Sequence, residues 1–151
     1  AGDGALKKQY IKLASKTGFK DRIRFLGHVS DMPTLYKMCD LAVSTSRSEG
    51  LPFNIMEAMA CGLPVVASRI KGHTDLLGEQ QNVCLYQLGD EKALTNLMLK
   101  FLHDRHLCEQ AGNINRHRVQ SYLLERAKPV IEKVYEKAYK ELLKEGDETH
   151  G

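Results

Sequence analysis

The chain has 151 residues, enough to bury about two-thirds of its unfolded surface in one domain without disulfides. Its formal net charge is only +3, with lysines interspersed among glutamates, which argues against a nucleic-acid-binding protein. No apolar run approaches the roughly 20 residues of a membrane span and no secretory signal opens the chain, so the cytoplasm is the expected location.

Helices and strands alternate in the first part of the chain. The hydrophobic pattern predicts a helix over residues 5–16, a strand over 22–26, a helix over 33–38 and a strand over 41–45. The last segment reads Leu-Ala-Val-Ser-Thr, which indicates a short strand buried on both faces.

A turn and a helix follow this second strand. Residues 50–52, Gly-Leu-Pro, predict a tight turn with proline in the first turn of a helix that ends at Gly62. The amides of Phe53 and Asn54 then lack intrahelical partners, and with the helix macrodipole they form a small positive site suited to a diphosphate. Gly50 lets a ligand approach the backbone closely.

The alternation continues to the middle of the chain. We expect a third strand over residues 64–67, a short helix after His73 and a fourth strand over 83–86. Strands that alternate with helices predict an α/β fold: a doubly wound, Rossmann-like parallel sheet covered on both faces, with ligands at the carboxyl ends of the strands. Gly27, Glu49 and Gly72 all fall at such ends.

The C-terminal part is predicted to be helical. One helix follows Asp90, another runs through Leu107 and Ala111, and a long helix follows Ser121. Apolar residues recur along that last helix at helical spacing: Val130, Ile131, Val134, Tyr135, Ala138 and Leu142. Such a stripe most often packs into a core, and packing against a partner domain is the alternative.

Two carboxylates bracket the start of the helix after Pro52. Glu49 lies in the loop before it and Glu57 lies more than one turn into it. An ionised carboxylate only accepts hydrogen bonds, so it pairs well with the vicinal hydroxyls of a ribose or a hexose. A nucleotide sugar combines such hydroxyls with a diphosphate. The plainer interpretation is that both glutamates are simply solvated.

Three other patterns carry less chemistry. The four cysteines are dispersed without a Cys-x-x-Cys pair and are interpreted as reduced core thiols: Cys39, Cys61, Cys84 and Cys108. His103, His106 and Cys108 are close in sequence but lack a fourth ligand, so no metal site is predicted. Gly2-x-Gly4 begins a dinucleotide-binding pattern, but Lys7 occupies the place of its third glycine.

The segment from residue 46 to residue 68 resembles the donor-binding signature of the retaining GT-B glycosyltransferases, in the large family called group 1 or family four. That signature has two glutamates separated by seven residues, as Glu49 and Glu57 are here, within Ser-Glu-Gly-Leu-Pro and Glu-Ala-Met-Ala-Cys-Gly-Leu-Pro-Val-Val. The resemblance extends to residues 24–29, 35–40 and 71–77. Within the family the chain is most similar to bacterial exopolysaccharide and capsular polysaccharide transferases.

The resemblance implies a role for each matching position. Glu49, the catalytic candidate, would accept hydrogen bonds from the transferred sugar, and Glu57 would bind the ribose. The other donor-binding positions would be the turn and helix start (Gly50, Leu51, Phe53 and Asn54), which hold the diphosphate or sugar, and Gly27, His28 and Val29, which border the base. The family often has Gly-Gly and a following Glu where this chain has Lys71-Gly72 and Asp75.

The resemblance also implies an activity: transfer of a sugar from a nucleoside diphosphate sugar, most often a UDP-sugar, to an acceptor hydroxyl with retention and without a metal or other cofactor. Residues 1–120 would be a partial donor-binding domain and 121–151 its C-terminal helix and tail. The family's first strands and its N-terminal acceptor-binding domain are missing, so the chain is expected to be a fragment that is inactive alone.

Several alternatives stay open. A GT-B-like epimerase or hydrolase would act without an acceptor, and a binding module would hold the nucleotide sugar without turnover. The acceptor would be a saccharide or a lipid-linked saccharide. A peripheral contact with the inner face of the membrane, through residues such as Arg116, His117 and Arg118, is the minority interpretation of the basic residues.

Overall fold

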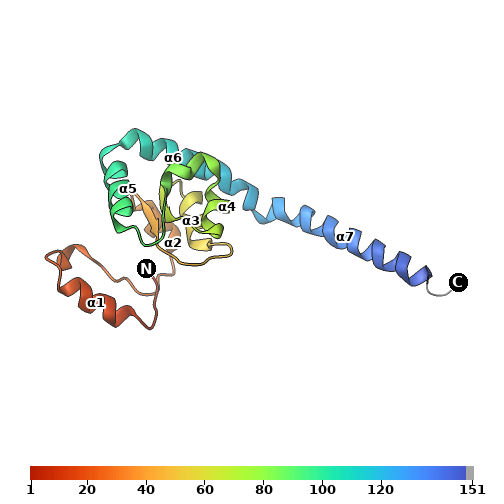
Figure 1. Cartoon of the computed structure of the whole chain (residues 1–151), viewed down its shortest axis with the longest axis horizontal. Coiled ribbons are helices and arrows are strands. Elements are labelled where there is room, and N and C mark those ends of the chain that lie inside the picture. Colours follow the sequence, from red (N-terminus) through yellow and green to blue (C-terminus); the bar gives the residue numbers. More distant parts are fainter. Residues whose placement is uncertain (149–151) are drawn as a thin grey trace. The chain divides into compact units, whose positions relative to one another are not determined.

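The computed structural model describes residues 1–148, which form two compact units (Figure 1). The first unit comprises residues 1–35 and the second begins at residue 36. Among the described residues, no helix is both long enough and apolar enough to cross a membrane.

The first unit contains α1 (Lys7–Ser15) and the short 3-10 helix η1 (Lys20–Arg22), and α2 (Met32–Lys37) begins in it. Both predicted helices in this region, at 5–16 and 33–38, are confirmed. Gly2 and Gly27 form an isolated antiparallel bridge, with Gly2 N donating to Gly27 O at 2.5 Å. The carboxylate of Asp3 accepts from His28 N at 3.0 Å and binds Lys7 Nζ, and the bond from Lys7 is the main reason that the pKa of Asp3 is lowered.

The strand predicted at residues 22–26 is wrong. Arg22 ends η1, and the residues after it form no ladder with the rest of the first unit apart from the single bridge at Gly27. Ile23, Phe25 and Leu26 are 40–47% exposed. A strand needs a hydrogen-bonded partner along its length, and these residues have none in the first unit beyond that bridge.

The second unit is built on a three-stranded parallel sheet in the order β1 (Ala42–Ser44), β2 (Val65–Ser68), β3 (Leu85–Tyr86). The predicted parallel sheet is therefore confirmed, with three strands in place of four. The prediction that the strand at 41–45 is buried on both faces is wrong, because β1 is an edge strand and Val43 is 41% exposed.

Helices cover both faces of the sheet, as a doubly wound fold requires. Successive side chains of β2 point to opposite faces. Val65 and Ala67 pack with residues of α3 (Phe53–Ala60) and α4 (Lys71–Leu77), namely Ile55, Ala58, Met59, Leu76 and Leu77. Val66 packs on the other face with Phe101 of α5 (Glu91–His103) and Ala111 of α6 (Arg105–Val119).

Local sequence explains where these elements begin. The Asp90 side chain accepts from Ala93 N at 2.8 Å at the start of α5, and the Asp104 side chain accepts from Leu107 N at 2.9 Å at the start of α6. The 3-10 helix η2 (Glu79–Cys84) occupies the beginning of the strand predicted at 83–86, so β3 starts only at Leu85.

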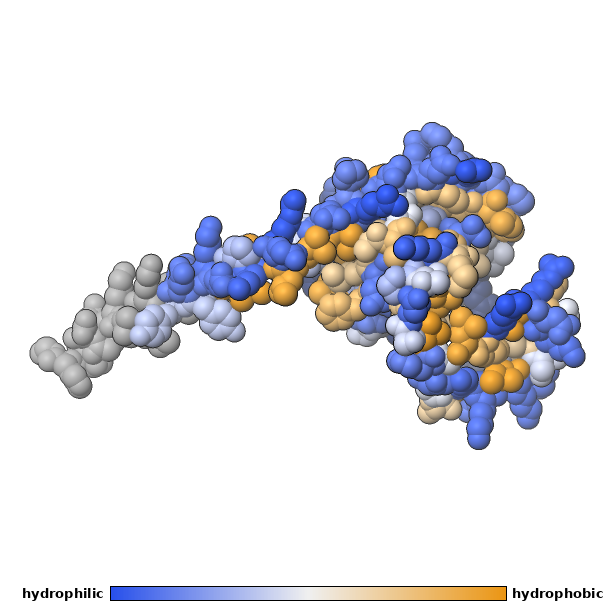
Figure 2. Space-filling view, turned by 180° about the vertical axis from the view of Figure 1, so that it is seen from behind, coloured by the Kyte–Doolittle hydropathy of each residue, from blue (hydrophilic) through white to orange (hydrophobic). Residues whose placement is uncertain are grey.

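A 3-10 helix, η3 (Gln120–Tyr122), leads into the long helix α7 (Leu124–Glu148). Figure 2 shows apolar side chains along one side of α7. These side chains are 50–73% exposed: Val130, Ile131, Val134, Tyr135 and Tyr139. For these positions, the interpretation of the stripe as core packing is therefore wrong. Ala138 and Leu142, the other two residues of the predicted stripe, lie outside the residues whose side chains are described.

Candidate functional site

The loop after β1 carries Glu49 to the carboxyl end of the sheet. Ser46 Oγ donates to Glu49 Oε1 at 2.8 Å, and both residues are half-buried. β1 and β2 are neighbouring parallel strands, with Ser44 opposite Ala67, so the loops that leave them lie at the same edge. This is the position at which ligands bind in open α/β sheets.

Gly72 brings the first turn of α4 against this loop. A Cβ at Gly72 would lie 2.4 Å from Glu49 O and 2.9 Å from its carbonyl carbon, both backbone atoms. Only a residue without a side chain permits this approach. The sequence placed Gly72 at a strand end, and the structure adds that its backbone positions the loop of Glu49.

The start of α3 leaves two amides available. Pro52 is the buried N-cap, so the helix begins one residue after the proline rather than at it, and Pro52 O accepts from Ile55 N and Met56 N at 3.0 and 3.1 Å. Within residues 1–148, the amides of Phe53 and Asn54 have no hydrogen-bond partner. With the dipole of the eight-residue α3, they give this end a partial positive charge.

The turn before α3 is open to solvent. A Cβ at Gly50 would meet no atom within 4 Å, and Leu51 and Phe53 are 43% and 68% exposed. Asn54 is exposed as well. The predicted diphosphate-binding positions therefore lie together on an accessible stretch of backbone.

Tyr36 holds Glu57, the second carboxylate. The Tyr36 hydroxyl shares its one hydrogen between two acceptors, Asn54 O at 2.9 Å and Glu57 Oε2 at 3.2 Å. Burial, and secondarily the charge of Glu57, raises the pKa of Tyr36 to about 12, so the hydroxyl keeps its proton at neutral pH. Glu57 itself is exposed on α3, where its carboxylate can accept further hydrogen bonds.

Gly27, His28 and Val29, the predicted base-binding residues, belong to the first unit. Gly27 adopts a positive φ of 69°, and a Cβ there would lie 3.1 Å from Lys7 Nζ and 3.2 Å from Asp3 Oδ2. The Asp3 contacts fix the backbone of this turn, while the His28 side chain is exposed.

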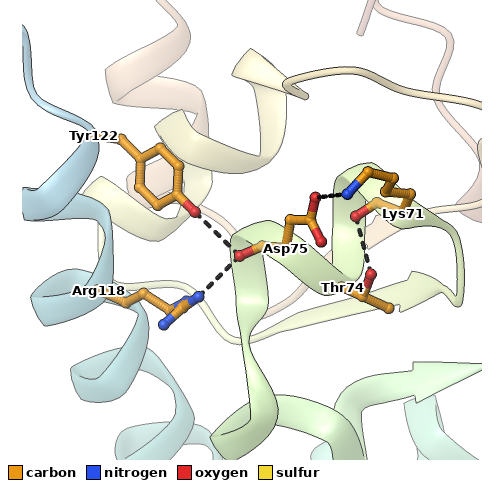
Figure 3. A network of polar contacts seen from close by, with 5 residues as sticks. All are labelled: Lys71, Thr74, Asp75, Arg118 and Tyr122. Atoms are coloured by element: carbon orange, nitrogen blue, oxygen red, sulfur yellow. Dashed lines mark hydrogen bonds and ion pairs between the residues drawn. The ribbon is translucent and has the colours of Figure 1, made fainter. Parts of the chain in front are cut away.

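Lys71 and Asp75, which depart from the family pattern, pair with each other (Figure 3). Lys71 Nζ lies 2.7 Å from Asp75 Oδ2, and this hydrogen bond raises the pKa of Lys71. The carbonyl of Asp75 accepts from Arg118 Nη2 at 2.8 Å and from Tyr122 Oη at 3.1 Å. Arg118 Nε also donates to Leu76 O at 2.5 Å, so Arg118 caps the C-terminal end of α4.

The structure assigns a packing role to another basic residue as well. The Arg116 guanidinium lies over Gly62, where an added Cβ would be 2.3 Å from Arg116 Nη2.

An open cleft of about 480 Å³ lies away from the start of α3. It is formed by η2, α6, η3 and α7, and its lining residues include Gln80, His117 and Arg126.

The prediction that all four cysteines are core thiols is wrong for one of them. Cys84 is buried and donates to Gln81 Oε1 at 2.9 Å, and burial raises the pKa of its thiol to about 11. Cys39 is exposed, so its interpretation as a core thiol is wrong. Among residues 1–148, no three His, Cys, Asp or Glu side chains gather closely enough to hold a metal ion.

Sequence reasoning missed three side chains that support the carboxylates: Tyr36, Ser46 and His73. Ser46 stands three residues before Glu49, a spacing that could have suggested a local hydrogen bond. Tyr36 lies 21 residues from Glu57 and His73 lies 29 residues from Ser44, and no local pattern links either pair.

Comparison with known proteins identifies what the chain is similar to. The model of the family described as "Glycosyl transferases group 1" matches residues 1–118. The lipopolysaccharide core biosynthesis mannosyltransferase LpsB of Rhizobium meliloti (strain 1021) is 30% identical over 135 residues, which cover 87% of this chain and 38% of that protein. The chain spans about a third of the length of the curated relatives it matches.

Two solved structures share the fold. Sucrose-phosphate synthase from Thermosynechococcus elongatus superposes with a TM-score of 0.80 at 26% identity, over 92% of this chain and 36% of that one. HepE from Anabaena, solved in complex with UDP-glucose, superposes with a TM-score of 0.76 at 25% identity, over 86% of this chain and 36% of that one.

Proposed function

This chain belongs to the family of group 1 glycosyl transferases, and on that premise we propose that it is the donor-binding part of a retaining enzyme that moves a sugar from a nucleoside diphosphate sugar to an acceptor hydroxyl. A UDP-sugar is the proposed donor, which the UDP-glucose complex of HepE supports. The proposed pathway is exopolysaccharide or capsule synthesis, and the similarity to a lipopolysaccharide core mannosyltransferase supports a role in polysaccharide assembly.

The observation that carries the proposal is the arrangement around the start of α3. The amides of Phe53 and Asn54, which have no hydrogen-bond partner within residues 1–148, begin a helix whose dipole favours an anion, next to an open turn. The diphosphate of the donor would bind here. The negative charge that develops on the leaving diphosphate would be stabilised by the same amides, an effect worth several kcal/mol when the donors are preorganised.

The carboxylates would bind the two sugars of the donor. Glu57, held by Tyr36, has a free lone pair for the ribose hydroxyls, and Glu49, held by Ser46, has one for the transferred sugar. No residue in this arrangement is assigned as a covalent nucleophile or a general base; the leaving phosphate would accept the acceptor's proton. The proposal includes no metal ion, since the helix end takes up the charge.

The remaining partners are part of the proposal as well. The acceptor would be a saccharide or lipid-linked saccharide held by a further domain, and the chain alone would not turn over. The enzyme would work in the cytoplasm, with a peripheral contact at the inner face of the membrane as the alternative. Gly27, His28 and Val29 would border the base.

Glu57→Ala tests the site directly. We expect this variant to weaken binding of the nucleoside diphosphate by about 1–3 kcal/mol, the loss expected for charge-assisted hydrogen bonds. Titration calorimetry with UDP, GDP, ADP and dTDP measures the change. The control is Glu91→Ala, an exposed glutamate at the start of α5. Equal affinities of wild type and Glu57→Ala would remove Glu57 from the site.

A second experiment separates the proposed transferase from the alternatives. A labelled donor is incubated, with and without acceptor, with the proposed whole enzyme, that is, this chain together with an acceptor-binding domain. A transferase gives transfer product. Acceptor-independent free or isomerised sugar would indicate a hydrolase or epimerase, and binding without turnover would indicate a binding module.

A further inference from the structure

A completely buried histidine lies behind the loop that carries Glu49. His73 in α4 is 0% exposed. Its Nδ1 lies 2.8 Å from Ser68 O, and because a carbonyl oxygen only accepts, Nδ1 carries the hydrogen. The ring is thereby fixed, and its Nε2 lies 3.1 Å from the hydroxyl of Ser44 at the end of β1.

A chain of polar contacts runs from this ring to Glu49. Ser44 Oγ donates its one hydrogen to His73 Nε2, so its approach to Ser46 Oγ at 3.4 Å is a contact without a shared hydrogen. Ser46 Oγ donates to Glu49 Oε1 at 2.8 Å. The link between the ring and Ser46 is Ser68, whose carbonyl accepts from His73 Nδ1 and whose Oγ donates to Ser46 O at 2.6 Å. Ser46 is therefore fixed through both its carbonyl and its hydroxyl.

This series of polar contacts leads out of the core and reaches the candidate site. Ser44, Ser68 and His73 are at most 5% exposed, whereas Ser46 and Glu49 are half-buried at the carboxyl edge of the sheet. Fully satisfied buried polar networks rigidify the groups they connect. The group at the end of this network is the Glu49 carboxylate, whose other oxygen, Oε2, has no partner in the described part of the chain.

We propose that Ser46, oriented by Ser44, Ser68 and His73, is a positioning residue that holds the Glu49 carboxylate for the hydroxyls of the transferred sugar. The inference rests on the proposed function. The hydrogen bond from Ser46 to Oε1 fixes the rotamer of Glu49. The other oxygen, Oε2, is then held in one orientation as the acceptor for the sugar. Binding the sugar then costs less ordering of the side chain.

The test measures the contribution of the sugar alone. UDP-, GDP-, ADP- and dTDP-hexoses are titrated calorimetrically, each beside its own nucleoside diphosphate. The Kd of the nucleoside diphosphate divided by the Kd of the nucleotide sugar gives the affinity gained from the sugar. We expect Ser46→Ala to reduce this ratio about fivefold, the factor for one net hydrogen bond, with the affinity for the nucleoside diphosphate unchanged. Ser46→Thr keeps the hydroxyl and restores the ratio.

A double-mutant cycle shows whether Ser46 acts through Glu49. In the Glu49→Ala background, Ser46→Ala should cause no further loss, because its target is absent. Ser48→Ala, an exposed serine of the same loop, is the matched control. Melting by circular dichroism checks the fold of each variant. If Ser46→Ala does not fold, Ser44→Ala replaces it, with a smaller loss of the same kind expected.

The outcomes distinguish this inference from the proposed function. If the wild type binds a donor but Ser46→Ala changes nothing, weakens nucleoside diphosphate and donor equally, or acts independently of Glu49, the positioning role is wrong and the proposed function stands. If the wild type binds no member of the panel, the proposed function is overturned, and this inference falls with it.

Discussion

Tyr36 links Glu57 to the start of α3 through a single hydroxyl. The contact lies between residues that are 21 positions apart in sequence. The two glutamates were recognisable from their spacing and surroundings, since both lie in one continuous segment. Tyr36, Ser44 and His73 were not recognisable, because their relation to the site exists only after β1, β2, α2 and α4 are packed.

The pKa of Tyr36 gives a prediction about stability at alkaline pH. The pKa is raised to about 12 in the folded chain, against an ordinary value of 10, mainly by burial. The stability that protonated Tyr36 contributes is therefore fully present below pH 10 and is lost as the pH rises toward 12. Tyr36→Phe should show a smaller fall in melting temperature over this range than the wild type.

Thermal melts at several pH values between 8 and 12 measure this difference. Tyr10→Phe is the control, because Tyr10 is 54% exposed. The alkaline curve of Tyr10→Phe should follow that of the wild type. A Tyr36→Phe curve with the same slope as the wild type would contradict the assigned pKa.

At the scale of elements, α6 contacts the turn after α3 and the C-terminal end of α4. Gly112 of α6 lies so close to the turn after α3 that an added Cβ would be 2.1 Å from Gly62 O, and Asn115 Nδ2 donates to Leu63 O at 2.8 Å. Further along α6, Arg118 caps α4. The positions of α3 and α4, which flank the candidate site, therefore depend on α6.

Gly112→Ala tests this dependence. We expect the variant to be destabilised by about 1–3 kcal/mol, because the clash is with a backbone atom that cannot rotate away. This cost exceeds the gain of about 1 kcal/mol that alanine normally brings inside a helix. Urea unfolding measures the free energy of unfolding. Gly18→Ala, where a Cβ meets no atom within 4 Å, is the control; equal stability of both variants would refute the packing argument.

The sequence predicted whether a segment is a helix or a strand more reliably than it predicted strand pairing or burial. The helices at α1, α2, α3 and α5 and the three parallel strands were predicted from periodicity and capping residues, which are local. The strand at 22–26 and the full burial of residue 43 were wrong, because strand formation and edge exposure depend on which segments pair.

At the scale of the whole molecule, the chain has a Rossmann-like fold with an additional exposed apolar surface. The fold is shared with longer solved structures, of which this chain covers 36%. The apolar stripe of α7 is exposed in the described residues. Packing of this stripe against a further domain stays a prediction, and so do the acceptor, the linkage and the domain limits at residues 120 and 121.

The central claim is that a nucleoside diphosphate binds at the start of α3. Two-dimensional ¹H–¹⁵N NMR of the labelled chain, titrated with UDP, GDP, ADP and dTDP, tests it most directly. The account predicts saturable shifts of the Phe53 and Asn54 amide signals with at least one of the four, because these amides would donate to phosphate oxygens. The absence of shifts at both amides, or shifts confined to the basic cleft around His117 and Arg126, would contradict it.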